Sequence, residues 1–207
     1  MSEPTKPKSV QAREFLLAQE QRRTLMRNAS IAIASVFVVG AIIWYVADQT
    51  AQGEQDKLRP PANPAEQTIP NEGEGHEADG TPLTFNHYPP SSGTHYGTPA
   101  AYGYYEQPVS EGYFVHSLEH GAVLVLYNCP TACPDLQAKL NALYNSAPKR
   151  RCDDVRMIVT PYSQGMTTPI TLIAWGKQLD LAAYDEAAIL NFYKRYEDRG
   201  PELIPCA

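Results

Sequence analysis

The longest apolar run of the chain lies near its N-terminus. No charged residue interrupts residues 29–47, and Trp44 and Tyr45 stand close to the end of this run. A bilayer core needs about 20 apolar residues in a helix, and aromatic rings favour the membrane interface. The run exceeds the apolar region of about 7–15 residues that is typical of a signal peptide. We therefore expect an uncleaved single transmembrane helix.

The charges on the two sides of this run predict its orientation. Arginines precede it and acidic residues follow it: Arg22, Arg23 and Arg27, then Asp48, Glu54 and Asp56. The positive-inside rule puts the N-terminus in the cytoplasm. Residues 1–28 are then a cytoplasmic tail with an amphipathic helix, and the bulk of the chain is extracytoplasmic, either periplasmic or on the cell surface.

Beyond the apolar run, the pattern predicts a linker and then one folded domain. Residues 48–82 are rich in Pro, Gly, Glu, Gln and Asn, which is typical of a flexible linker. His76 lies in this segment and is interpreted as a solvated linker residue. The remaining 83–207 begin with a stretch dense in Pro, Gly and Tyr, the composition of an ordered loop.

Within 83–207, short apolar runs alternate with one amphipathic pattern and one run of helix-forming residues. A buried strand is predicted from the Val- and Leu-rich run that follows Gly121, and Leu136, Leu140, Leu143 and Tyr144 share one helical face. The order β-α-β-β-α predicts a small mixed-sheet α/β domain, for which a thioredoxin-like arrangement is one option. The predicted strands are 122–127, 155–160 and 170–175, and the predicted helices are 134–146 and 185–197.

The charge distribution narrows the choice of partners. The chain has a formal net charge of -6, and its acidic residues concentrate in 48–207. Nucleic-acid binding needs a basic face that replaces counterions, so we expect no nucleic-acid partner. The membrane is the expected partner of residues 29–47, and the sequence identifies no protein partner.

Four of the five histidines fall within 34 residues, close to the predicted central strand. Imidazole suits Zn, Cu and Ni, and a thioether favours copper. The candidate metal ligands are His95, His116 and His120, with His87, Glu119 and Met166 as residues that complete or orient the site. Each histidine taken alone is more often a hydrogen-bonded structural residue, so a site without metal is the alternative.

His116-Ser-Leu-Glu-His120 also matches the inverted zincin string H-x-x-E-H. That string binds zinc on a helix, where two histidines four residues apart share a face. The aromatic residues before it and the strand directly after it leave little room for a helix. We therefore expect two imidazoles in one turn and no protease.

The four cysteines, Cys129, Cys133, Cys152 and Cys206, are an even number on the expected extracytoplasmic side. They most simply form two structural disulfides, in any of three pairings. The string Cys129-Pro-Thr-Ala-Cys133-Pro134 lies between a predicted strand and a helix, where thiolates are stabilised. It resembles the C-x-x-x-C-P string of Sco-type copper chaperones, which implies thiol–disulfide or copper-chaperone chemistry as an alternative.

Several ordered motifs resemble a bacterial family of single-span membrane proteins known as domain of unknown function 3105. They are Pro89-Pro-Ser-Ser-Gly-Thr-His95, Gly103-Tyr-Tyr, Val115-His-Ser-Leu-Glu-His-Gly-Ala-Val123 and Ala174-Trp-Gly176. The resemblance implies an extracytoplasmic domain and no established activity. Its motif histidines correspond to His95, His116 and His120.

Together, these patterns predict a membrane-anchored domain that binds a transition metal, with copper favoured over zinc, and that performs no turnover. The alternatives are a redox protein that uses Cys129 and Cys133, and a structural or assembly module without metal.

Overall fold

The computed structural model describes residues 8–57, 59–149, 152–202 and 204, and it divides into two compact units, residues 1–58 and 59–207. In the first unit, a single helix, α1 (Lys8–Lys57), covers the described residues. Its stretch Gln21–Ala47 is long and apolar enough to cross a membrane, and none of that stretch is buried by protein. An apolar surface of this size is stable in lipid and unfavourable in water. The chain therefore carries an N-terminal helix that is suited to anchoring in a membrane.

Two hydroxyl groups within this stretch are satisfied by the helix itself. Ser30 Oγ donates to the carbonyl of Met26 at 2.9 Å, and Ser35 Oγ donates to the carbonyl of Ile31 at 2.9 Å. A hydroxyl in hydrocarbon has no water partner, so a backbone acceptor one turn earlier lowers the free energy of placing it there. These two serines are therefore compatible with a membrane span.

The second unit is built on a six-stranded mixed sheet in the order β1-β8-β7-β5-β6-β4. The central strand β5 runs parallel to β6 and antiparallel to β7. A separate two-stranded parallel sheet joins β2 to β3. The strands are β1 (Gln67–Thr68), β2 (His76–Glu77), β3 (His95–Tyr96), β4 (Gly103–Tyr104), β5 (Val123–Tyr127), β6 (Met157–Pro161), β7 (Ile170–Ala174) and β8 (Lys177–Leu181).

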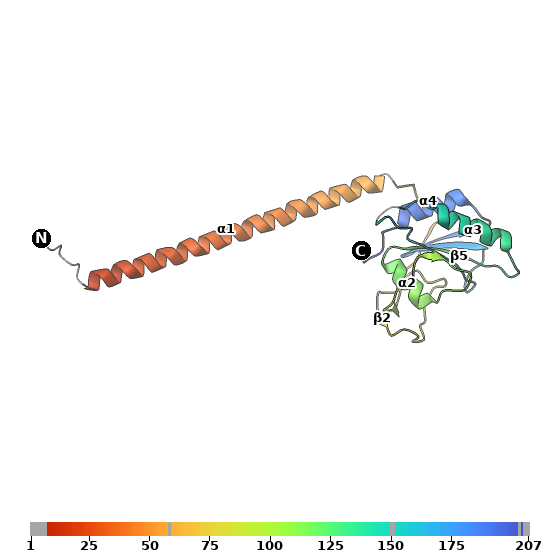
Figure 1. The fold of residues 1–207 in the computed structure, drawn as a ribbon, viewed down its shortest axis with the longest axis horizontal. Helices are drawn as coiled ribbons and strands as arrows, with labels where there is room; N and C mark the ends of the chain where they lie inside the picture. Colours follow the sequence, from red (N-terminus) through yellow and green to blue (C-terminus); the bar gives the residue numbers. More distant parts are fainter. Residues whose placement is uncertain (1–7, 58, 150–151, 203, 205–207) are drawn as a thin grey trace. The chain divides into compact units, whose positions relative to one another are not determined.

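Helices cover both faces of the large sheet, which makes a three-layer α/β unit (Figure 1). Helices α3 (Pro134–Ser146) and α4 (Glu186–Tyr196) lie on one face, and α2 (Glu111–Glu119) lies on the other. Alternate residues of β5 face opposite layers, so Val125 packs in the cluster with α3 and α4, whereas Leu124 packs in the cluster with α2. All five residues of β5 are buried, as the unbroken apolar run predicted.

The mixed α/β prediction is confirmed, with additions. The predicted strands and helices correspond to β5, α3, β6, β7 and α4 within two residues at each end. The structure adds β8, whose sequence Lys177-Gln-Leu-Asp-Leu181 has the alternating pattern of a half-buried strand. It also adds α2, which contains the segment where we expected too little room for a helix.

The region predicted to be a flexible linker, 48–82, is divided between helix α1 and the second unit in the part that the structure describes. Helix α1 continues to Lys57, and the residues from Arg59 onward belong to the second unit. Arg59 Nη1 donates to three carbonyls at the end of α4, those of Lys194 (3.2 Å), Arg195 (2.8 Å) and Glu197 (3.0 Å). Because the last carbonyls of a helix lack helical partners, this guanidinium stabilises the C-terminus of α4. Hydrogen bonds thus help to order a Pro- and Gly-rich segment that buries few apolar side chains, among them Ile69.

Candidate metal centre

Helix α2 supplies three polar side chains at one end of the central strand. His116 and Glu119 lie within the helix and His120 is its C-terminal cap. Histidines four residues apart share a helical face, and here their rings are 4.5 Å apart between centroids. The expectation that this string has no helix is wrong, because the helix starts earlier, at Glu111, and ends at a tight turn.

Gly121 makes this tight turn possible. Its φ of +83° is unfavourable for any residue with a side chain, and a Cβ at this position would lie 2.7 Å from the Asp198 Cα. The same close approach holds the C-terminal segment against the helix end, since Asp198 N–H donates to the Gly121 carbonyl at 2.9 Å. Glu202 N–H likewise donates to the Glu119 carbonyl at 3.1 Å. A segment from the end of the chain is therefore fixed beside α2.

The small sheet brings two further histidines together. In the parallel pairing of β2 with β3, His76 lies opposite His95, and their ring centroids are 4.6 Å apart. The backbone N–H of His95 donates to the Gly75 carbonyl at 2.8 Å, which fixes the two segments. His76, interpreted from the sequence as a solvated linker residue, thus lies within the histidine group.

Backbone carbonyls fix the tautomers of two of these rings. His95 Nδ1 is 2.8 Å from the Gly93 carbonyl, and His116 Nδ1 is 2.6 Å from the Tyr96 carbonyl. A carbonyl oxygen only accepts hydrogen bonds, so each Nδ1 carries a proton and donates it. In a neutral ring the lone pair is then on Nε2. This arrangement, with the second ring nitrogen bonded to a carbonyl, is the one that metal-ligating histidines adopt.

The Nε2 atoms converge on one another and on carboxylates. Glu119 Oε2 is 3.0 Å from His95 Nε2 and 3.5 Å from His76 Nε2. His116 Nε2 is 3.1 Å from His120 Nε2, which is 3.0 Å from Glu202 Oε2. With a neutral ring, the lone pair of His95 Nε2 faces a carboxylate oxygen of Glu119, which is also an acceptor. The lone pair of His116 Nε2 faces His120 Nε2, which donates or accepts according to the tautomer of His120. The contact between His95 and Glu119 becomes favourable when a proton or a metal ion lies between the two acceptors.

These contacts define two overlapping groups that could hold a metal ion. Each group offers four ligand atoms that lie within 4.8 Å of one another. Imidazole and carboxylate ligands together suit zinc and divalent copper. The first group is His76, His95, His116 and Glu119, and the second is His116, Glu119, His120 and Glu202.

The centre is more buried than an ordinary surface cluster. His95 is 0% exposed, Glu119 is 4% exposed and His116 is 6% exposed, whereas the His76 side chain is 49% exposed. Burial lowers the pKa of His116, and the neighbouring rings of His120, His95 and His76 lower it further against the opposing effect of the Tyr96 carbonyl. Lowering the pKa favours the neutral ring, which is the form that binds metal.

Two of the residues predicted to complete the site have other contacts. His87 belongs to neither group. Its Nδ1 donates to the Pro89 carbonyl at 2.9 Å and its backbone N–H donates to Glu72 Oε1 at 3.0 Å. Met166 packs against the apolar cluster that contains α2. His87 therefore has a local structural role in the loop, and Met166 contributes to the apolar packing.

The cysteines form a separate feature of the unit. Cys129 and Cys133 are joined by a disulfide across a separation of four residues. Cys152 is also disulfide-bonded, and Cys206 lies outside the described residues. Among the three pairings that the sequence allowed, the structure therefore favours the one that joins Cys129 to Cys133.

Sequence reasoning missed His76 and Glu202. Neither residue lies in an apolar pattern or a recognised string, and each reaches the centre through backbone hydrogen bonds between distant segments. Three of the motifs that carry the family resemblance converge here, those that contain His95, His116 and Trp175. Trp175 contacts the His95 ring edge-on at a centroid distance of 6.5 Å, and Gly176 N–H donates to the Ser91 carbonyl at 3.2 Å.

Comparison with known proteins gives one match. No curated protein matches the chain, and no solved structure matches it, so the thioredoxin-like option stays a prediction. A family model described as a protein of unknown function, DUF3105, matches residues 76–207. The match begins at His76, and it contains all the histidines and carboxylates of the two groups. The chain therefore belongs to the DUF3105 family.

Proposed function

We propose that the second unit binds a divalent transition-metal ion through His95, His116, His120 and Glu119, with His76 and Glu202 as additional ligands. One observation carries this proposal: backbone carbonyls fix the Nε2 lone pairs of His95 and His116, and these lone pairs converge with a carboxylate oxygen of Glu119 and with His120 Nε2. A metal ion satisfies all these atoms at once, whereas a single proton bridges only one pair of them.

Copper is the favoured metal, and zinc is the alternative. The donor set consists of nitrogen and carboxylate oxygen, which divalent copper and zinc both accept. At equal availability, the Irving–Williams order favours copper over zinc at such a site. The thioether of Met166, expected from the sequence to favour copper, is not needed for this argument.

The task that we infer is binding or delivery of the ion without turnover. In the inverted zincin arrangement, the glutamate has to act as a general base toward a metal-bound water. Here Glu119 Oε2 is 3.0 Å from His95 Nε2, and the carboxylate is almost fully buried. A glutamate in this position acts as a metal ligand or as a partner of an imidazole, and it has little access to a substrate.

We further propose that the centre lies outside the cytoplasm. The stretch Gln21–Ala47 supports membrane anchoring, and the arginines before the apolar run support a cytoplasmic N-terminus. The disulfide bond of Cys152 supports the same side of the membrane, because structural disulfides persist in oxidising compartments.

Metal content tests the proposal directly. The full chain is purified in detergent without a histidine tag, loaded separately with copper(II) or zinc(II), dialysed, and examined by elemental analysis. We expect one tightly bound ion per chain, because the two groups share His116 and its single Nε2 lone pair binds one ion. Substituting His116→Gln removes the one imidazole that both groups share, so stoichiometric binding should be lost.

His87→Gln is the matched control, because His87 lies in the same part of the chain and outside both groups. This variant should bind as much metal as the original chain. A purified chain that takes up no stoichiometric copper or zinc, with both variants folded alike, would favour the structural or assembly module instead.

A further inference from the structure

The disulfide between Cys129 and Cys133 lies at the carboxyl edge of the parallel part of the sheet. The chain runs from β5 through these cysteines into α3 and returns in β6, which is parallel to β5. In open α/β sheets, ligands bind in the crevice outside the carboxyl ends of parallel strands. The cysteine pair therefore occupies a part of the fold where reactive groups can meet a ligand.

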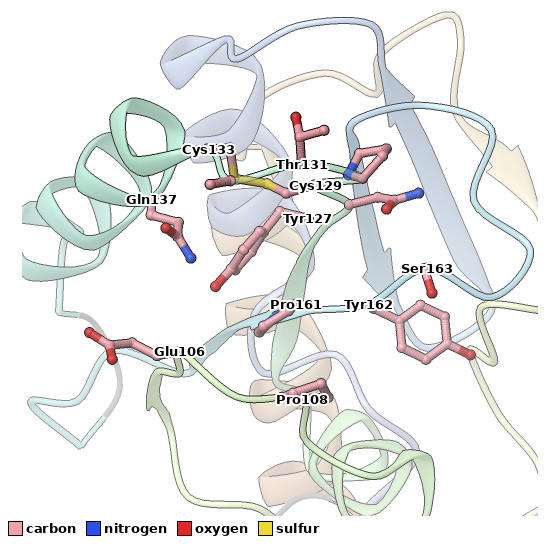
Figure 2. Close-up of a pocket in the computed structure, with 13 residues that line it drawn as sticks. Glu106, Pro108, Tyr127, Cys129, Thr131, Cys133, Gln137, Pro161, Tyr162 and Ser163 are labelled. Carbon is pink, nitrogen blue, oxygen red and sulfur yellow. A yellow bond between two sulfur atoms is a disulfide. The ribbon is translucent and has the colours of Figure 1, made fainter.

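A surface pocket of about 540 Å³ lies at this edge, and both cysteines line it. Figure 2 shows the disulfide at one side of the pocket, with Tyr127 and Gln137 beside it and Glu106 and Pro161 opposite. The lining combines aromatic and proline rings with an amide and a carboxylate. Such a surface can hold a short peptide segment through apolar contacts and a few hydrogen bonds.

The position of the disulfide is unlike that of a structural brace. It joins residues only four apart in the sequence, so it closes a short loop and constrains the unfolded chain less than a disulfide between distant segments does. Both cysteines are partly exposed. An incoming sulfur atom can therefore reach the bond without unfolding of the sheet.

The two cysteines have different surroundings, which predicts different roles. Cys133 is the N-cap of α3, where the positive end of the helix dipole stabilises a thiolate. Cys129 packs against the apolar cluster between the sheet and α3 and α4. In the reduced pair, Cys133 is then the better nucleophile, and Cys129 is placed to attack it.

We propose that Cys129 and Cys133 are a redox-active pair that reduces a disulfide carried by a peptide segment in this pocket. The Cys133 thiolate attacks one sulfur of the substrate disulfide; that bond breaks, and the other substrate sulfur leaves as a thiolate and takes up a proton. Cys129, which loses its proton to solvent, then attacks Cys133 Sγ, and the first substrate sulfur leaves and is protonated. Two electrons and two protons pass to the substrate, and the pair becomes the disulfide of the structure. A dithiol donor returns the pair to the reduced form by the reverse steps.

Redox titration of the full chain in detergent is the first test. The protein is equilibrated in buffers of graded ratios of reduced to oxidised glutathione, quenched with acid, and alkylated, and the peptide with both cysteines is measured by mass spectrometry. We expect reversible conversion between disulfide and dithiol while the near-ultraviolet circular dichroism of the folded protein persists. A pair that stays oxidised in every buffer that leaves the fold intact would overturn the proposal.

Trapping with oxidised glutathione assigns the two roles. In the Cys129→Ser variant, a mixed disulfide should accumulate at Cys133, and it should form about tenfold faster than the one at Cys129 in the Cys133→Ser variant. Ala132→Ser, in the same loop, is the control and should leave the titration of the pair unchanged. Equal rates in the two cysteine variants would contradict the assigned roles. If neither variant folds, the titration of the original chain still decides between an exchangeable and an inert disulfide.

Discussion

The two ends of strand β5 carry two different kinds of candidate site. Before its first residue, Val123, the histidine centre collects side chains from β2, β3, α2 and the C-terminal segment. After its last residue, Tyr127, the cysteine pair forms within a single loop. The first arrangement depends on contacts between residues as distant in sequence as His120 and Glu202, whereas the second needs only the local path of the chain. Damage to the tertiary contacts should therefore affect the first site far more than the second.

The largest effect is expected at Gly121, where α2 turns into β5. Gly121→Ala places a side chain at φ +83° and 2.7 Å from the Asp198 Cα, which should lower the free energy of unfolding by about 3–5 kcal/mol. Thermal unfolding followed by circular dichroism measures the change. Gly97→Ala is the control, because a Cβ there meets nothing within 4 Å, and a change of less than about 1 kcal/mol is expected. Equal destabilisation by both variants would show that the turn is not the critical contact.

Metal affinity should separate the buried ligands from the exposed one. Substituting the fully buried His95→Gln should weaken metal binding by about 100-fold, and His76→Gln by about tenfold, as estimated from the usual effects of changes around metal ligands. His76 is expected to matter less because its side chain is 49% exposed and its Nε2 is 3.5 Å from Glu119 Oε2. Competition titration with a chromogenic chelator measures both values. An unchanged affinity in His76→Gln would mean that His76 is not a ligand, as we expected from the sequence alone.

The order of the segment after Arg59 can be tested through its contact with α4. Arg59→Ala removes three hydrogen bonds to carbonyls at the end of that helix, and we expect a loss of about 2 kcal/mol of stability. Chemical denaturation measures the loss. Lys149→Ala is the control, since its ion pair with Asp153 is exposed and should contribute less than about 1 kcal/mol. If Arg59→Ala has no greater effect than the control, the segment behaves as the flexible linker predicted from composition.

The smallest effect expected is a dependence of stability on pH in the metal-free protein. The pKa of His116 is lower in the folded chain than its ordinary value of 6.5, so the unfolded chain binds the proton more readily. Stability is then fully present above pH 6.5 and decreases as the pH falls from there through the lowered pKa. Urea denaturation measures the free energy of unfolding over about three pH units, from roughly pH 8 to roughly pH 5. This free energy should decrease more steeply with falling pH for the original chain than for His116→Gln. Identical slopes would mean that another group dominates the pH dependence.

The sequence alone was sufficient for the parts of this protein that depend on local pattern. The apolar run predicted the stretch of α1 that is long and apolar enough to cross a membrane, and the alternation of apolar runs predicted β5, α3, β6, β7 and α4. The string Val115-His-Ser-Leu-Glu-His-Gly-Ala-Val123 identified three of the polar residues at the centre, and the family match agrees with that resemblance. Periodicity and short strings depend on neighbours in sequence, so they can be recognised without a fold.

Only the tertiary structure decided which side chains meet. His76 reaches His95 through pairing of two-residue strands, and Glu202 reaches His120 because the C-terminal segment bonds to the end of α2. His87, only eight residues before His95, turns to a carbonyl of its own loop. These outcomes depend on backbone hydrogen bonds between distant segments, and side-chain type and spacing along the chain carry no information about such bonds.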